Sequence, residues 1–311
     1  MTLTELKYIV AVAREKHFGR AAETCFVSQP TLSVAVKKLE DELDVKIFER
    51  GAAEVSVTPL GEQIVRQAQQ VLEQAAAIKE IAKLGKDPVS GPLRLGVIYT
   101  IGPYLLPDLV RQAIGRVPQM PLMLQENFTA KLLDMLRLGE LDCAIMAEPF
   151  PDTGLAIAPL YDEPFMAAVP AGHPMARRKQ VTAEELKNET LLLLGTGHCF
   201  RDHVLEVCPE YARFGSPSST GNEGMRKSFE GSSLETIKYM VASGMGVTVV
   251  PQLSVPVDKQ PHIRYVKFSA PAPTRRVVLA WRRTFPRYEA IAALRNCIYA
   301  CALPGVKRVS G

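Results

Sequence analysis

A capped helix over residues 28–43 places the strongest constraint on how this chain can fold. Ser28 is a good N-cap because its hydroxyl can accept from an orphan backbone N–H, and Pro30 falls in the first turn, where its missing N–H had no partner. Apolar residues then recur at helical spacing and predict one buried face: Leu32, Val36, Leu39 and Leu43. Two further amphipathic segments, over residues 3–13 and 18–25, precede this helix. Three helices joined in this way predict a helix-turn-helix domain.

The exposed side of the same helix carries side chains that suit DNA. Gln29, Thr31 and Ser33 lie near its N-terminus, where a recognition helix meets base edges in the major groove. Lys37 lies one turn further along and suits a phosphate. This pattern favours a DNA-reading helix.

A wing is predicted behind the helix. Residues 46–50 and 54–57 have the pattern of two short strands with a glycine turn at 51–53, which places Arg50 near a DNA backbone or minor groove. Residues 1–58 hold eight Lys or Arg and nine Asp or Glu, so a three-helix scaffold that binds protein is the competing interpretation. The predicted DNA-binding residues are Ser28, Gln29, Pro30, Thr31, Ser33, Lys37 and Arg50.

A long amphipathic helix is predicted to start at Thr58–Pro59 and to end near Leu84. Apolar residues repeat along it in steps of four and three: Ile64, Ala68, Val71, Ala75, Ile78 and Ala82. Such a seam pairs two helices, so we expect a dimer; packing on its own domain is the alternative. The chain then divides into a winged helix-turn-helix at 1–58, a linker helix at 59–87 and a regulatory domain at 88–311.

The regulatory domain alternates strands and helices, which predicts an α/β fold with a parallel sheet. Strands are predicted at 93–98, 120–126, 142–146, 165–170, 191–194, 247–250 and 277–281, and helices at 104–117, 131–138 and 233–242. The last strand returns to the first lobe, so lobe I takes about 88–163 plus 269–311 and lobe II about 164–268. Thr100 and Thr129 follow strand ends and should share one crevice, where ligands of such sheets bind.

Two cysteines flank a helix predicted to open at His198–Cys199 and to run toward Cys208. A thiol at a helix N-terminus is favoured as the reactive thiolate, and His198 and Arg201 are placed to assist. Nine residues of helix span ~13.5 Å and put the two side chains on opposite faces. A disulfide needs Cα atoms about 4.4–6.8 Å apart, so the two could pair only if the helix unfolds. The alternative is two unrelated cysteines, with Cys208 in the core.

Composition narrows the remaining functions. The other four cysteines, Cys25, Cys143, Cys297 and Cys301, are interpreted as packing residues, and without a CxxC pair we expect no metal and no cofactor. No apolar run approaches the ~18 residues of a membrane span, and the N-terminus lacks a secretion signal, so a cytoplasmic protein is expected. The net charge of +4 permits nucleic-acid binding without requiring it.

The run from Phe18 to Arg50, with AAETCFVSQPTLSVAVKKLEDEL inside it, resembles the DNA-binding domain of LysR-type transcriptional regulators. The resemblance implies a winged helix-turn-helix that binds double-stranded DNA, a dimerising linker helix and a two-lobed regulatory domain like a periplasmic binding protein. It also implies a homodimer that pairs into a homotetramer, and RNA polymerase as a partner.

Most of the chain is also similar to the OxyR family, the hydrogen-peroxide-sensing activators. The similarity is carried by GHCFRD followed by Cys208, by YTIGPYLLP at Tyr99–Pro107 and by SSLETIKYMVASGMGV at Ser232–Val247. It implies that peroxide oxidises Cys199 to a sulfenic acid and that Cys208 resolves it as a disulfide. It also implies a peroxide pocket of Thr100, Thr129 and His198, with Arg275 stabilising the thiolate. Ala130 departs from the family, in which a histidine is expected there.

The family resemblance implies a stoichiometric sensor that controls antioxidant genes and is reset by a cellular thiol reductant, and not an enzyme. Two other functions stay open at this point. A LysR-type regulator could bind a small carboxylate between its lobes, where two threonines would serve equally well. A thiol peroxidase could carry a DNA-binding domain.

Overall fold

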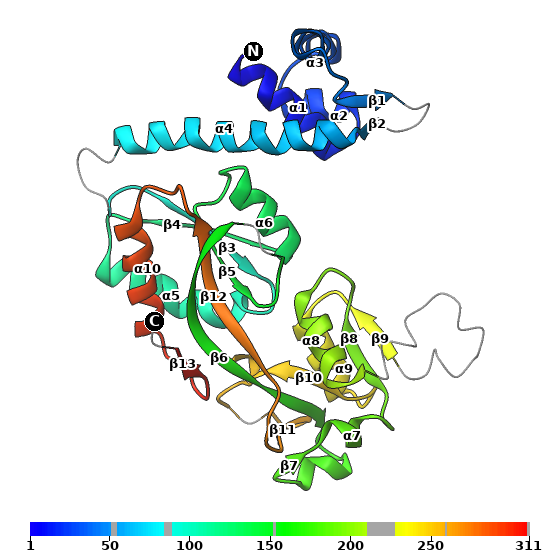
Figure 1. Ribbon diagram of the computed structural model, residues 1–311. Coiled ribbons are helices and arrows are strands. Elements are labelled where there is room, and N and C mark those ends of the chain that lie inside the picture. The colour runs from blue at the N-terminus through cyan, green and yellow to red at the C-terminus, as the bar shows by residue number, and fades with distance from the viewer. Residues whose placement is uncertain (51–54, 84–88, 152–153, 210–227, 259, 310–311) are drawn as a thin grey trace. The chain divides into compact units, whose positions relative to one another are not determined.

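The computed structural model describes residues 1–50, 55–83, 89–151, 154–209, 228–258 and 260–309 (Figure 1). The chain separates into two compact units, one extending from Met1 to Lys86 and the other formed by most of the chain from Asp87 onward. No described helix is both long and apolar enough to cross a membrane.

The N-terminal unit begins with helices whose capping hydrogen bonds come from residues next to each helix start. The Thr2 hydroxyl accepts from the Glu5 N–H while the Glu5 carboxylate accepts from the Thr2 N–H, which forms a capping box. The Ser28 hydroxyl accepts from the Thr31 N–H at 3.3 Å, as its N-cap position predicts. The elements are α1 (Leu3–Glu15), α2 (Phe18–Thr24), α3 (Gln29–Leu43), β1 (Phe48–Arg50), β2 (Val55–Val57) and α4 (Pro59–Lys83).

The predicted helix-turn-helix and wing strands are confirmed. β1 and β2 pair antiparallel, with Phe48 opposite Val57; the turn at 51–53 lies outside the described residues. The buried face of α3 contains Leu32, Val36 and Leu39. Leu43 is 38 % exposed, so its predicted burial is wrong; it stands in the last turn of α3, beyond the buried row.

The long helix α4 is 25 residues, close to its predicted length. Its first half packs against α1 and buries Val65 and Ala68. Further along, Val71 is 37 % exposed and Ile78 is 68 % exposed. Packing on its own unit therefore buries the first part of the helix, whereas Val71 and Ile78 of the later seam are exposed.

The first lobe of the regulatory unit is a mixed sheet with helices packed on it (Figure 1). β3 (Leu93–Ile98) lies parallel to β4 (Leu122–Asn127) and β5 (Cys143–Ala147), as predicted, but β12 (Thr274–Arg282) pairs antiparallel with both β5 and β6 (Leu155–Pro170). The predicted parallel sheet is therefore confirmed for β3, β4 and β5 but did not include the antiparallel strands, which arise because the chain returns from the second lobe in the opposite direction. The elements are β3 (Leu93–Ile98), α5 (Gly102–Arg116), β4 (Leu122–Asn127), α6 (Thr129–Arg137), β5 (Cys143–Ala147), β12 (Thr274–Arg282), α10 (Tyr288–Ala300) and β13 (Lys307–Arg308).

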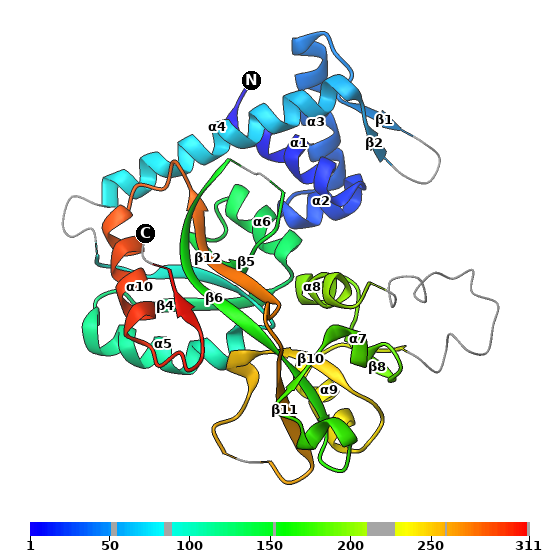
Figure 2. The ribbon, with the colours of Figure 1, turned by 60° about the horizontal axis from the view of Figure 1, so that its bottom comes forward.

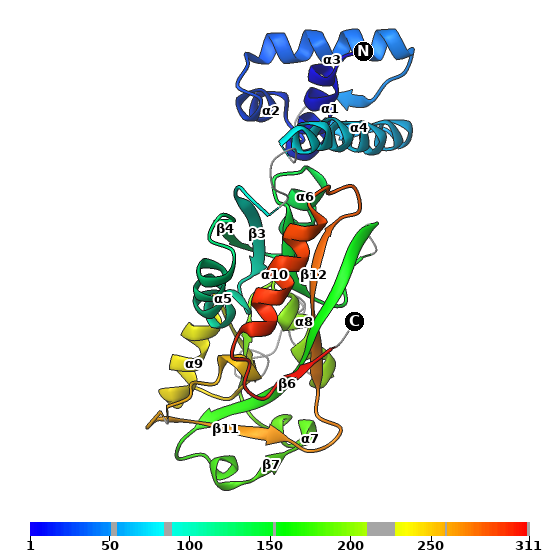
Figure 3. The same ribbon diagram turned by 90° about the vertical axis from the view of Figure 1, so that its left-hand side faces the viewer.

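Two long strands carry the chain between the lobes. β6 (Leu155–Pro170) pairs with β12 over its first part and with β10 and β11 over its second part (Figures 2 and 3). The sequence predicted only residues 165–170 as strand. Two prolines and two acidic residues within 155–164 interrupt the apolar pattern, so pairing with β12 rather than local propensity extends the strand.

The second lobe positions the helix that starts at Cys199. All four leucines of β8 are buried, and Phe200 and Val204 of α8 enter the same core. The elements are η1 (Pro174–Arg177), β7 (Gln180–Val181), α7 (Ala183–Leu186), β8 (Leu191–Leu194), α8 (Cys199–Val207), β9 (Ser228–Gly231), α9 (Leu234–Ala242), β10 (Thr248–Pro251), η4 (Gln252–Ser254) and β11 (Ile263–Phe268). The predicted architecture of winged helix-turn-helix, long helix and two-lobed α/β domain is confirmed.

Candidate functional site

The helix α8 begins at Cys199, with His198 as its N-cap, as the sequence predicts. The Cys199 thiol is half-buried and stands at the positive end of the helix dipole, which favours an anion there. Cys208 is fully buried at the other end of the helix, and neither sulfur is in a disulfide. Because the helix is intact, its length of ~1.5 Å per residue keeps the two sulfurs too far apart to bond.

A small cavity lies directly against Cys199. It is lined by Ile98, Tyr99, Thr100, Asn127, Phe128, Thr129, Gly197, His198 and Cys199. The volume open to the centre of a water-sized molecule is about 10 Å³, which is room for about one such molecule. The three residues predicted for the pocket, which lie far apart in sequence, therefore meet at the thiol.

Two hydroxyl groups give this cavity its polar character. Thr129 Oγ1 is buried and has no hydrogen-bond partner within the described part of the chain. Thr100 Oγ1 accepts from Arg275 Nη1 at 2.8 Å, which leaves the hydroxyl proton of Thr100 available as a donor. A buried hydroxyl without a partner is costly, so a small polar ligand beside it would supply a missing hydrogen bond.

Arg275 stands behind Thr100 and does not line the cavity. Its guanidinium is buried, forms an ion pair with Glu163 at 2.8 Å and also donates to the Thr100 carbonyl at 3.0 Å. Arg276 points the other way and pairs with Asp162 on the exposed face of β12. Of the two adjacent arginines, Arg275 is thus the one that faces the site, and it acts on the cavity through Thr100.

His198 closes one side of the cavity as a neutral ring. Burial lowers the pKa of His198, and a hydrogen bond to the Ser232 backbone opposes part of that shift. The ring is 8 % exposed and meets the rings of Tyr99 and Phe128. A neutral imidazole beside the thiol can exchange a proton but adds no fixed charge.

Arg201, one turn into α8, has partners of its own. Its Nη1 pairs with Glu230 at 2.6 Å and donates to the Leu194 carbonyl at 3.0 Å. Its charge is therefore neutralised by a carboxylate, and the side chain fastens α8 to the end of β8 and to β9. These contacts of Arg201 do not involve Cys199, so they do not support the predicted assistance to its thiol.

Apart from Arg50, the residues predicted to read DNA lie on α3 and at its N-cap. Gln29, Pro30, Thr31 and Lys37 are exposed, and Ser33 is half-buried. The side chain of Arg50 lies outside the described part of the chain.

Several acidic groups of the N-terminal unit are already committed elsewhere. Glu40 accepts the N–H groups of Ile47 and Phe48, and Glu42 pairs with the N-terminal amine. Glu40 and Glu42 therefore have partners within the N-terminal unit.

Comparison with known proteins identifies the family of this chain. Residues 3–62 match the bacterial regulatory helix-turn-helix model of the lysR family, and residues 86–301 match the LysR substrate binding domain. The OxyR dual regulator of Escherichia coli is 40 % identical over 94 % of both chains. A full-length OxyR structure from Pseudomonas aeruginosa is 52 % identical, with a TM-score of 0.72 over 97 % of this chain and 96 % of that one.

The chain is a LysR-type regulator of the OxyR kind. It is a DNA-binding regulator of transcription and not an enzyme. A hydrogen-peroxide-bound OxyR mutant from Corynebacterium glutamicum has the same fold, at 33 % identity and a TM-score of 0.62 over 96 % of this chain and 91 % of that one. The OxyR-like fold thus joins the helix-turn-helix and the thiol site in one chain.

The remaining cysteines of this OxyR-like chain are poor candidates for redox chemistry. Cys143, Cys297 and Cys301 are buried, and burial raises the pKa of each thiol, to about 12 for Cys301. Cys25 is half-buried against the core of the N-terminal unit, and burial raises its pKa as well. Less thiolate means slower oxidation, so they fit the predicted packing roles. Within the described residues no cluster of His, Cys, Asp or Glu could hold a metal ion.

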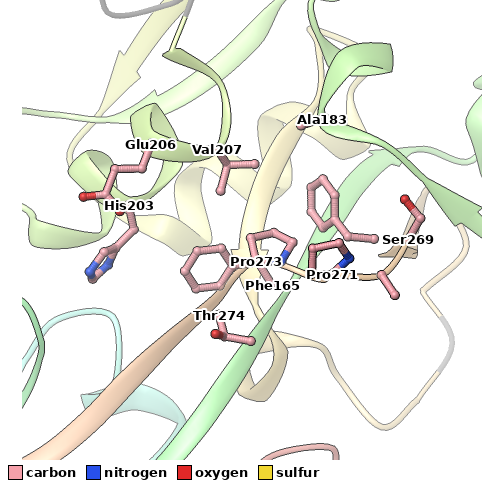
Figure 4. Close-up of a pocket in the computed structure, with 11 residues that line it drawn as sticks. Phe165, Ala183, His203, Glu206, Val207, Ser269, Pro271, Pro273 and Thr274 are labelled. Carbon is pink, nitrogen blue, oxygen red and sulfur yellow. The ribbon is translucent and has the colours of Figure 1, made fainter.

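A second pocket, of about 430 Å³, lies beside the later turns of α8 (Figure 4). Figure 4 shows His203, Glu206 and Val207 on one side of it and Ser269 and Pro271 on the other. His203 Nε2 donates to the carbonyl of Glu148 at 2.8 Å, and burial lowers the pKa of His203. This hydrogen bond ties α8 to the first lobe while the helix is intact.

Sequence reasoning missed five residues that line the Cys199 cavity, among them the two that supply aromatic rings, Tyr99 and Phe128. Each of these two directly precedes a predicted pocket threonine, so position alone could have suggested them. Ala130, where the family pattern suggested a histidine, is exposed and does not line the cavity.

Proposed function

We propose that this OxyR-like regulator detects hydrogen peroxide through Cys199 and controls antioxidant genes through its N-terminal unit. The observation that carries the proposal is the cavity at the thiol, in which Cys199 meets Thr100, His198 and the unpartnered hydroxyl of Thr129. The relatives named hydrogen peroxide-inducible genes activators support the same function.

The first chemical step is attack of the Cys199 thiolate on one peroxide oxygen. The S–O bond forms as the O–O bond breaks, and the departing hydroxide takes a proton and leaves as water. The sulfur is oxidised by two electrons to a sulfenic acid. Thr100 and Thr129 are placed to hold the peroxide by hydrogen bonds while the sulfur attacks.

The second step joins the two cysteines. The Cys208 thiolate attacks the sulfenic sulfur, the S–S bond forms, and the hydroxyl leaves as a second water molecule. Because α8 separates the two sulfurs, this step requires the helix to unfold, and the hydrogen bond from His203 to Glu148 is lost with it. Formation of the disulfide is therefore coupled to the unfolding of α8. A cellular dithiol reduces the disulfide again by thiol–disulfide exchange.

The signal reaches DNA through paired chains. In this proposal the exposed seam of α4, with Val71 and Ile78, pairs two copies into a dimer, and two dimers form a tetramer. The helix-turn-helix at 1–58 then binds double-stranded DNA through α3, with Gln29, Thr31 and Ser33 toward the bases, and RNA polymerase is the downstream partner. A shape change at 88–311 alters the spacing of the paired recognition helices through the linker at 59–87.

A small carboxylate as the effector is disfavoured by the charges of the neighbouring cleft, which has a volume of about 390 Å³. The carboxyl groups of Glu126 and Glu235 line this cleft, and Glu235 is paired with Lys238. The nearby guanidinium of Arg275 is already paired with Glu163. An anion entering the cleft would therefore meet carboxyl groups and no lysine or arginine among these described lining residues.

The test is to treat the full-length protein with low peroxide and to map every cysteine by mass spectrometry. We expect a Cys199–Cys208 disulfide in the native chain and a trappable sulfenic acid at Cys199 in a Cys208→Ser variant. A Cys143→Ser variant is the control and should behave like the native chain. If Cys199 and Cys208 stay unmodified while other cysteines react, the proposed function is wrong.

A further inference from the structure

Three aromatic rings meet edge to face above Cys199. Tyr99 follows β3, Phe128 lies between β4 and α6, and His198 precedes α8. The ring centroids are 5.2 Å apart for Tyr99 and Phe128, 4.8 Å for Phe128 and His198, and 5.8 Å for Tyr99 and His198. Each ring therefore touches both of the others, in a geometry that aromatic quadrupoles favour.

The same rings separate two spaces of very different size. Tyr99, Thr100, Phe128 and His198 line both the cleft of about 390 Å³ and the cavity of about 10 Å³. Cys199 lines only the small cavity. The ring triangle therefore lies between the cleft and the sulfur.

Phe128 is seated closely enough to act as a wall. A Cβ atom on Gly197 would lie 3.3 Å from the ring of Phe128, so the ring packs directly on the glycine backbone. Gly197 has a φ of +99°, a conformation that glycine adopts readily and other residues rarely do. Phe128 is 37 % exposed and Tyr99 is 39 % exposed, so the triangle is a partition with solvent on its outer side.

We propose that the Tyr99–Phe128–His198 triangle is a size-selective lid that admits hydrogen peroxide to Cys199 and excludes bulky organic hydroperoxides. The inference rests on the proposed function and adds its substrate specificity. Hydrogen peroxide is little larger than water and fits a cavity with room for about one such molecule. A hydroperoxide reacts by the same step, in which S–O forms, O–O breaks and the alkoxide leaves as the alcohol after protonation. Its organic group would have to occupy the space of the rings.

The test compares the rate at which Cys199 forms sulfenic acid with hydrogen peroxide and with cumene hydroperoxide. The full chain carries Cys208→Ser, so that oxidation stops at the sulfenic acid, which is trapped and quantified by intact mass. In the Phe128→Ala variant we expect the cumene hydroperoxide rate to rise about tenfold or more relative to the hydrogen peroxide rate. A Tyr288→Ala variant, which removes an exposed aromatic ring from α10, is the matched control and should leave the ratio unchanged.

The ratio of the two rates is the decisive reading, because a general loss of structure would change both rates together. An unchanged ratio in Phe128→Ala overturns the lid, and so does a native chain that reacts equally fast with both oxidants. If Phe128→Ala does not fold, the same ratio of rates is measured in Tyr99→Leu and Phe128→Leu variants. Failure of hydrogen peroxide to oxidise Cys199 in the native chain would overturn the proposed function itself, and the lid with it.

Discussion

The ion pair behind the thiol site offers the sharpest test of the fold. Arg275 and Glu163 face each other across β12 and β6, and their side chains are 1 % and 0 % exposed. Glu163 also accepts the N–H of Leu253 at 2.8 Å, so its two oxygens have separate partners. Replacing Arg275 with Met would remove the positive charge and leave the buried carboxylate uncompensated.

Breaking one side of a buried ion pair costs about 3–5 kcal/mol, because the remaining charge stays desolvated. For a unit of roughly 200 residues each kcal/mol shifts the melting temperature by about 2–4 °C, so Arg275→Met should lower it by roughly 6–20 °C. A second variant that combines Arg275→Met with Glu163→Gln should recover part of this loss. The glutamine carbonyl can still accept from the Leu253 N–H and carries no charge.

Thermal unfolding can be followed by the fluorescence of Trp281, the only tryptophan in the chain, which lies in β12 itself. Arg276→Met is a matched control one residue away, because Arg276 pairs with Asp162 on an exposed face and such pairs contribute about 0–1 kcal/mol. If Arg275→Met lowers the melting temperature no more than Arg276→Met does, the reasoning about the buried pair is refuted.

Three further predictions concern the helix seam, the DNA-reading surface and the response to pH. Lysine at both Val71 and Ile78 should convert the proposed dimer to monomer, because charge would enter the apolar seam; sedimentation that shows an unchanged dimer would contradict this. Lys37→Gln should weaken DNA binding about equally on all sequences and reduce the slope of log K against log salt by about one, as measured by fluorescence anisotropy. A slope equal to that of the native chain would show that Lys37 meets no phosphate. The regulatory unit should lose stability as pH falls below the ordinary histidine pKa of 6.5, because burial lowers the pKa of His203 and the unfolded chain then binds more protons than the folded one. Urea unfolding at pH 7.5 and 5.5 tests this. The free energy of unfolding of a His203→Gln variant should depend less on pH than that of the native chain. Equal dependence in both would show that groups other than His203 cause the effect.

Local sequence determined the parts of this protein whose signals span only a few residues. The N-cap at Ser28, the apolar spacing along α3 and the helix start at Cys199 were all predicted, because caps and periodicity act over one or two turns. The same signals predicted strand β3 at Leu93–Ile98 to the residue. They could not predict the first half of β6, whose prolines and acidic residues become a strand only through pairing with β12.

Tertiary structure decided everything that depends on contacts between distant segments. Adjacent arginines on a strand face opposite sides, and only the pairing of β12 with β6 shows that Arg275 is the buried one. The cavity at Cys199 gathers Thr100, Thr129 and the ring of Phe128 from separate strand ends. A helix cap is satisfied by its own neighbours, whereas a cavity exists only after sheet pairing has brought its walls together, so its size and closure could not be read from spacing along the chain.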